Sequence, residues 1–196
     1  MRSDEKILKR LENKALHYLG RYASTEARLR EVLSRFAQRK MPDEDPAHMR
    51  KMIDTMITSC VEKGYVDDSA FAAQKTASLR RGGNSRMAIS RKLFQRGIDR
   101  DIINNAINDF DEEHSLDHDY DAELEAALIY ARKRRLGPYA TLPIGKTEMK
   151  EGWQNRHYAS FARAGFGGKT IAIVMGLDTP EAAEEFLEEN RSISGR

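Results

Sequence analysis

The sequence predicts an all-α fold, built as tandem repeats of three-helix units in an elongated, curved array. Apolar residues recur at the i, i+3, i+4 spacing of a helix along nearly the whole chain, and no segment shows the period-two alternation of a strand. The pattern also repeats, because Leu93–Ile98 ahead of the helix with Ile103 resembles Phe161–Phe166 ahead of the helix with Ile171, at an offset of 68 residues. A weak internal repeat of this kind is typical of helical arrays.

Nine apolar stripes, each as wide as one buried helix face, predict nine or ten short helices. In chain order the stripes cover residues 7–22, 29–36, 49–61, 71–79, 102–110, 124–131, 158–162, 171–175 and 182–187. Residues that favour a helix start precede several of them: Ser24, Asp67, Asn84, Asp99 and Thr179. Glycines stand at positions 64, 97, 165 and 176, where a left-handed residue would end a helix.

Single helices of this length are marginal in water, so each must bury its stripe against its neighbours within a small unit. The boundaries that we predict are 1–66 for a first three-helix repeat, 67–112 for a second, 113–120 for an acidic linker, 121–176 for a third repeat, and 177–196 for a C-terminal helix and tail. Leu136–Gly152 contains two prolines and three glycines, and it is expected to interrupt the third repeat as a long loop.

Composition and charge limit the classes of protein. The longest stretch without a charged side chain, Leu136–Gly145, has ten residues, whereas a membrane span needs about 20 apolar residues. The chain starts with charged residues and not with an apolar leader, and it has a single cysteine, so we expect a protein of the cytoplasm. We also expect a monomer. Cys60 is the single cysteine and falls on an apolar stripe, which favours a buried, inert thiol.

Charge is distributed in blocks, although the net charge is only +2. Residues 101–125 contain ten acidic side chains and no Lys or Arg, whereas two clusters elsewhere are strongly basic. Such clusters favour contact with nucleic-acid phosphates or with an acidic protein groove, and the alternative is a solvated helix face. The candidate partner- or DNA-binding residues are Arg80, Arg81, Arg86, Arg91, Lys92 and Arg96 in the first cluster, and Arg132, Lys133, Arg134 and Arg135 in the second.

No pattern in the sequence indicates an enzyme, a cofactor or a metal site. Gly165–Thr170 resembles the end of a phosphate-binding loop, but the position that requires the first glycine holds Arg163. A helical turn followed by a new helix is the better interpretation. His114 and His118 are four residues apart among several Asp residues, yet no third ligand follows at a metal-binding spacing.

The segment Gly64-Tyr65-Val66-Asp67-Asp68, followed by Phe71-Ala72, resembles the signature of the RecX family of recombinase regulators. Further parts fit the repeats of that family in order: Leu19 to Leu33, Leu93 to Ile98, Ala127 to Arg135 and Ala164 to Phe166. The resemblance covers about residues 10–190. It implies tandem three-helix repeats, which agrees with the repeat found in the residues themselves.

The resemblance also implies a function. RecX-like proteins bind the RecA nucleoprotein filament in its helical groove and damp strand exchange, ATP hydrolysis and coprotease activity, without a cofactor. It implies that the chain is not an enzyme, that its partner is a RecA-type recombinase filament, and that single- or double-stranded DNA binds more weakly. Asp111–Asp121 and Leu136–Gly152 are longer than the family core requires. The alternative function is a sequence-independent DNA-binding helical module that acts without a recombinase.

Overall fold

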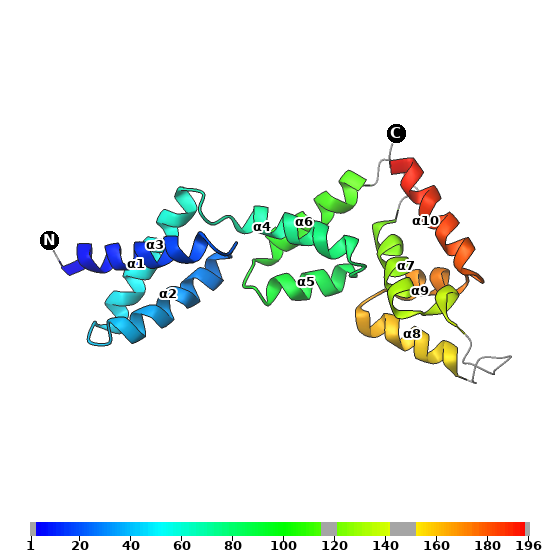
Figure 1. Ribbon diagram of the computed structural model, residues 1–196, viewed down its shortest axis with the longest axis horizontal. Helices are drawn as coiled ribbons and strands as arrows, with labels where there is room; N and C mark the ends of the chain where they lie inside the picture. Colours follow the sequence, from blue (N-terminus) through cyan, green and yellow to red (C-terminus); the bar gives the residue numbers. More distant parts are fainter. Residues whose placement is uncertain (1–2, 115–120, 142–151, 195–196) are drawn as a thin grey trace. The chain divides into compact units, whose positions relative to one another are not determined.

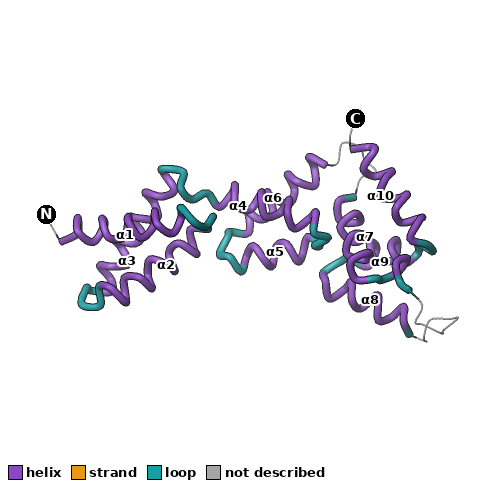
Figure 2. Tube along the Cα trace, viewed as in Figure 1, coloured by secondary structure: helices purple, strands orange, loops and turns teal. Residues whose placement is uncertain are grey.

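The computed structural model describes residues 3–114, 121–141 and 152–194, and this part of the chain is helical (Figures 1 and 2). It contains ten α-helices and one short 3-10 helix, and no strand occurs among the described residues, so the prediction of an all-α fold is confirmed. In chain order the elements are α1 (Ser3–Leu19), α2 (Glu26–Lys40), α3 (Pro46–Glu62), α4 (Asp68–Arg81), α5 (Arg86–Phe94), α6 (Arg100–His114), α7 (Ala122–Arg134), η1 (Gly137–Tyr139), α8 (Trp153–Ala164), α9 (Gly168–Met175) and α10 (Pro180–Ser194).

The chain divides into two compact units. The first comprises Met1–Ala72 and Leu93–Ile103, and the second comprises Ala73–Lys92 and Asn104–Arg196. The range 67–112 is divided between the two units, so the predicted repeat boundaries stay a prediction. Residues 113 and 114 of the expected acidic linker belong to α6, and the expected loop 136–152 contains η1, while 115–120 and 142–151 lie outside the described residues.

Helices α1, α2 and α3 pack against one another in the first unit (Figure 1). Their apolar stripes meet in one core, as helical spacing requires when each helix buries a single face. Cys60 is part of this core and is 3% exposed. Burial raises the pKa of its thiol, which keeps the thiol protonated and is consistent with an inert side chain. The core residues are Ile7, Leu11, Ala15, Leu29, Leu33, Ala37, Met41, Met49, Ile53, Met56, Ile57, Cys60 and Val66.

The start of α2 is capped by Thr25, whereas the sequence pointed to Ser24. The Thr25 hydroxyl oxygen accepts a hydrogen bond from the Arg28 backbone N–H at 3.2 Å. The same hydroxyl donates to the Arg96 carbonyl oxygen at 2.8 Å. Ser24 and Thr25 are both polar residues with cap chemistry, and this second contact, with a residue 71 positions away, distinguishes Thr25.

A close approach between the turn after α5 and the start of α2 requires a glycine at position 97. Gly97 has a φ of +79°, and a Cβ atom there would lie 2.3 Å from the Cβ of Ala27. Beside this contact, Asp68 accepts a hydrogen bond from the Glu26 backbone N–H at 2.9 Å. The start of α2 is therefore a junction for both the start of α4 and the turn that follows α5.

Helix α7 lies at the centre of the second unit and is buried on more than one face. The sequence pattern gave it a single stripe, but Ala126 and Ile129 are buried as well. The reason is the turn between α4 and α5, because a Cβ atom on Gly83 would lie 2.9 Å from both Ile129 Cγ2 and the Tyr130 backbone nitrogen. The core residues of this unit are Leu124, Ala126, Ala127, Leu128, Ala131, Leu136, Phe161, Phe166, Ile171, Val174, Ala183 and Leu187.

We predict that Gly97→Ala destabilises the first unit more than Gly64→Ala does. Both glycines have a positive φ, but a Cβ atom on Gly64 meets nothing within 4 Å. Gly64→Ala should therefore cost only the left-handed strain of about 1–2 kcal/mol. Gly97→Ala adds the clash with Ala27, for an additional loss of about 1–3 kcal/mol in the free energy of unfolding. Urea denaturation measures both, and equal losses would contradict the close approach.

Candidate functional site

The ten predicted site residues lie at the ends of α4 and α7, along α5 and in the turn after α5. Arg96 belongs to the first unit, and the other nine belong to the second unit. Only Arg80 is buried. The nine exposed residues are Arg81, Arg86, Arg91, Lys92, Arg96, Arg132, Lys133, Arg134 and Arg135.

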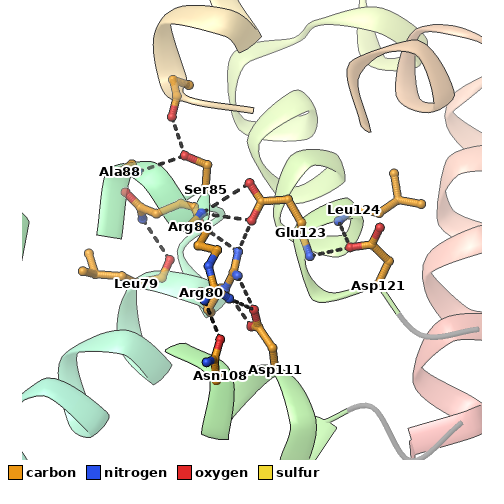
Figure 3. A network of polar contacts seen from close by, with 12 residues as sticks. Leu79, Arg80, Ser85, Arg86, Ala88, Asn108, Asp111, Asp121, Glu123 and Leu124 are labelled. Carbon is orange, nitrogen blue, oxygen red and sulfur yellow. Dashed lines mark hydrogen bonds and ion pairs between the residues drawn. The ribbon is translucent and has the colours of Figure 1, made fainter. Parts of the chain in front are cut away.

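Arg80 is held inside the second unit by two carboxylates (Figure 3). Its side chain is 3% exposed. Its Nε and Nη2 donate to the two carboxylate oxygens of Asp111 at 3.1 and 2.7 Å, and its Nη1 donates to Glu123 at 2.5 Å. Burial alone lowers the pKa of a guanidinium, but the hydrogen bond with Glu123 and the charges of Asp111 and Glu123 outweigh it and raise the pKa of Arg80.

This arrangement makes Arg80 a structural residue. Its guanidinium joins α4 to Asp111 on α6 and to Glu123 on α7, so it does not face an external phosphate. Arg80 therefore leaves the set of residues that we assign to a partner. The sequence alone did not distinguish it from Arg81, because both fall in the same run of basic residues.

The start of α5 is fixed by the same carboxylate and by a neighbouring serine. Glu123 also accepts the Arg86 backbone N–H at 2.9 Å (Figure 3). Ser85 caps α5 by accepting the Ala88 N–H at 3.1 Å, and its hydroxyl donates to the Ala164 carbonyl at 2.6 Å. The expected cap was Asn84, whose side-chain amide instead donates to the Leu79 carbonyl.

Arg86 is half exposed and has partners within the protein. Its guanidinium forms an ion pair with Asp111 at 3.4 Å and a hydrogen bond with Asn108. Its side chain is 44% exposed, so water screens the ion pair. Arg86 therefore supports the contacts of Arg80 from the surface of the unit.

Two residues of the second basic cluster also contact the protein itself. Arg132 forms an ion pair with Glu184 of α10 at 3.2 Å, and the hydroxyl of Tyr139 donates to the same carboxylate at 2.8 Å. The ammonium group of Lys133 donates to the Gly82 carbonyl at 2.8 Å. These contacts attach α10 and the α4–α5 turn to the end of α7, and they leave Arg132 and Lys133 less available to a partner.

The last two residues of that cluster, Arg134 and Arg135, lie in different local environments. The Arg134 guanidinium lies 6.0 Å from the centroid of the Tyr130 ring, a distance at which a cation still interacts with an aromatic face. Arg135 ends α7 with a φ of +54°, the one non-glycine residue in the described chain with a positive φ. A basic residue at this C-terminus also interacts favourably with the helix dipole.

Four cations from three helices of the second unit line a common groove, which we call the basic groove. Arg91 and Lys92 come from α5, Arg134 from α7 and Arg163 from α8. The groove has a volume of about 360 Å3 and also contains Ser160. Sequence reasoning missed Arg163, because it belongs to neither run of basic residues and 71 residues separate it from Lys92.

Other candidate sites of the sequence have simple structural explanations. Helix α8 ends at Ala164 and α9 begins at Gly168, so Gly165–Thr170 is a turn followed by the start of a new helix, as predicted. The His114 ring stacks on Phe110 at 4.0 Å, and His118 lies outside the described residues. Within the ranges 3–114, 121–141 and 152–194, no cluster of three side chains could bind a metal ion. No helix there is long and apolar enough to cross a membrane.

Comparisons with known proteins identify similar chains over most of this length. A family model for the second three-helix domain of RecX matches residues 67–107. Regulatory protein RecX of Myxococcus xanthus is 36% identical over 158 residues, which cover 80% of this chain and 79% of that protein. Regulatory protein RecX of Agrobacterium fabrum is 31% identical over 180 residues, which cover 91% and 89%.

A solved structure has the same fold. The crystal structure of RecX from Lactobacillus salivarius matches with a TM-score of 0.63 and covers 87% of this chain and 96% of that chain. The sequence identity is 17%, so this likeness concerns the fold.

We predict that Arg80→Met lowers the free energy of unfolding by about 3 kcal/mol, because two partly buried carboxylates lose their counter-ion. The matched control is Arg86→Met, which removes a half-exposed arginine of the same network and should cost less than about 1 kcal/mol. Urea denaturation measures both variants. Replacing Asp111 and Glu123 by their amides in the Arg80→Met chain should recover part of the loss. A loss no larger for Arg80→Met than for Arg86→Met would contradict the structural role of Arg80.

Proposed function

The chain belongs to the RecX family, and from that premise we propose that it binds the nucleoprotein filament of a RecA-type recombinase and inhibits it. The inhibition would extend to the ATPase, strand-exchange and coprotease activities of the filament. The observation that carries this proposal is the likeness to regulatory RecX proteins over 80% and 91% of the chain. We place this activity in the cytoplasm and assign it to a monomer without a cofactor.

Regulation by binding agrees with the features on the surface. The similar proteins are named regulatory proteins and not enzymes. A helical protein that places cations at helix ends presents charge over an area, which suits a charged assembly better than a small substrate. We therefore propose that the chain acts by occupying the filament and not by changing a covalent bond.

The electrostatic contacts would come from the exposed cations that have the fewest partners inside the protein. Arg80 is excluded by burial, and contacts within the protein reduce the contribution of Arg86, Arg132 and Lys133. Side chains on the surface lose little hydration when they meet phosphates or carboxylates at the rim of an interface. The residues that we assign to the partner are Arg81, Arg91, Lys92, Arg96, Arg134 and Arg135.

The competing function is binding to DNA without a recombinase, and the basic groove favours it. Contacts with phosphates alone would give weak binding that falls steeply with salt. The ten acidic residues in 101–125 oppose tight binding to bare DNA. The two functions therefore predict different relative affinities of the chain for recombinase-coated DNA and for bare DNA.

We predict that the purified chain slows ATP hydrolysis by the recombinase of its own organism on single-stranded DNA. It should also bind recombinase-coated DNA more tightly than bare DNA in gel-shift titrations at physiological salt. Both results follow if the filament surface, and not the DNA alone, supplies most of the contact. An unchanged ATPase rate at saturating concentrations would contradict the proposal, and equal affinity for both forms of DNA would favour the competing function.

A second prediction concerns the charges of α5 and the turn after it. Changing Arg91, Lys92 and Arg96 together to glutamate should weaken filament binding about tenfold or more, because attraction to anionic groups becomes repulsion. Thermal stability should stay nearly unchanged, since all three side chains are exposed.

The matched control reverses three other exposed cations, Lys6, Lys9 and Arg39, which gives the same change in net charge. This control should retain most of the binding. Inhibition of the ATPase by the first variant at the level of the unmodified chain would remove α5 from the proposed contact.

A further inference from the structure

We propose that the basic groove is a site for one phosphate of a DNA backbone, with Arg163 as a ligand that completes it. This inference rests on the proposed function, because it specifies where a chain that acts on DNA-bound filaments touches the DNA itself. It assigns Arg163 and Ser160, which lie on α8, to the same site as Arg91 and Lys92 of α5.

The charge of the groove is not balanced from within. Among the described residues, no ion pair involves Arg91, Lys92, Arg134 or Arg163, and no carboxylate lines the groove. Lys92 donates to the side-chain oxygen of Asn84 at 2.5 Å, which is a neutral partner. Four like charges around one concavity repel one another, and an anion in the groove would relieve that repulsion.

Three other arginines of the second unit are paired with carboxylates. Arg80, Arg86 and Arg132 each have a carboxylate within 3.4 Å. The unit therefore contains enough acidic side chains to neutralise arginines, but none of them is directed at the groove. Such a local excess of positive charge is typical of a phosphate contact.

The walls of the groove are fixed before any ligand arrives. The hydrogen bond from Ser85 to the Ala164 carbonyl, 2.6 Å long, holds the start of α5 against the end of α8. The Tyr130 hydroxyl lies 3.1 Å from the Ser160 hydroxyl, and the Tyr130 ring lies beneath the Arg134 guanidinium. Tyr130 thus positions two polar groups of the groove, which lowers the entropy lost on binding.

The geometry favours a phosphate over the carboxylates of an acidic protein. The four cationic side chains belong to three helices, α5, α7 and α8, so the donors line the groove from separate elements. A planar carboxylate is well matched by a single guanidinium fork, whereas a phosphodiester in a strand presents oxygens to several donors. Contacts with backbone phosphates carry no sequence information, which suits a protein that acts along a filament.

The test compares two arginines on the same helix. Arg163 lines the groove, and Arg156 is an exposed arginine seven residues earlier on α8 that does not line it. Seven residues correspond to about two helical turns, so both side chains project from a similar face. Arg163→Gln and Arg156→Gln remove the same charge, and circular dichroism and urea denaturation would verify that both variants fold.

Binding is measured by fluorescence anisotropy with labelled single-stranded DNA and with a duplex of the same length, without recombinase, between about 50 and 200 mM salt. Arg163→Gln should lose about tenfold in affinity. The slope of the logarithm of the binding constant against the logarithm of the salt concentration should become shallower by about 0.7 on single strands or about 0.9 on the duplex, because one phosphate contact is lost. Arg156→Gln should bind as the unmodified chain does. Ser160→Ala should weaken binding less than Arg163→Gln, since it removes a neutral donor.

Three results would overturn the assignment. Equal losses for Arg163→Gln and Arg156→Gln would mean that diffuse charge, and not a site, binds the DNA. Absence of DNA binding by the unmodified chain at low salt would exclude a phosphate site. Loss of binding to labelled poly-L-glutamate, but not to DNA, in Arg163→Gln would assign the groove to an acidic protein.

The recombinase experiment is independent of these results. If the unmodified chain leaves the ATPase rate unchanged but Arg163→Gln selectively loses DNA binding, the proposed function is contradicted and the phosphate site is supported. If the unmodified chain inhibits the ATPase but the two α8 variants lose DNA affinity equally, the proposed function is supported and the phosphate site is contradicted.

Discussion

The second unit depends on the ion pairs of one buried guanidinium group, that of Arg80. An arginine taken out of water is costly unless carboxylates surround it, and here Asp111 and Glu123 do so from two other helices (Figure 3). Because Glu123 also accepts the Arg86 backbone N–H, the start of α5 is tied to α7 through the same side chain. The position of α5 relative to α7, and with it the shape of the basic groove, follows from this network.

The basic residues of this unit consequently have two roles that look alike in the sequence. Arg80 and Arg86 neutralise the acidic residues of α6 and α7, and Arg132 attaches α10. Arg91 and Arg163 have no counter-ion among the described residues and face a shared groove. A protein that must stay folded and also attract a polyanion separates these roles, because a cation paired with a carboxylate of its own chain attracts a phosphate less strongly.

The acidic block of residues 101–125 has a similar double meaning. The sequence shows ten acidic residues in this block, but Asp111 and Glu123 are only 25% and 23% exposed and form ion pairs with Arg80. Under the proposed function, negative charge in this block would reduce binding to bare DNA and so favour a filament over naked strands. The proposed partner, a charged assembly that contains DNA, agrees with both family membership and the electrostatics of the second unit.

The sequence by itself determined the all-α class, the approximate helix positions and the family. These depend on patterns within short segments: the helical spacing of apolar residues, and a series of family motifs that includes Gly64–Ala72. It did not determine that Thr25 and not Ser24 caps α2, or that Arg80 is buried while Arg81 is exposed. Nor did it determine that Arg163 of α8 lines the same groove as the cations of α5. Each of these depends on a contact between residues far apart in the chain, such as Thr25 with Arg96 or Ser85 with Ala164. Only tertiary packing brings such residues together, because periodicity specifies which face of a helix is apolar but not which helix will cover it.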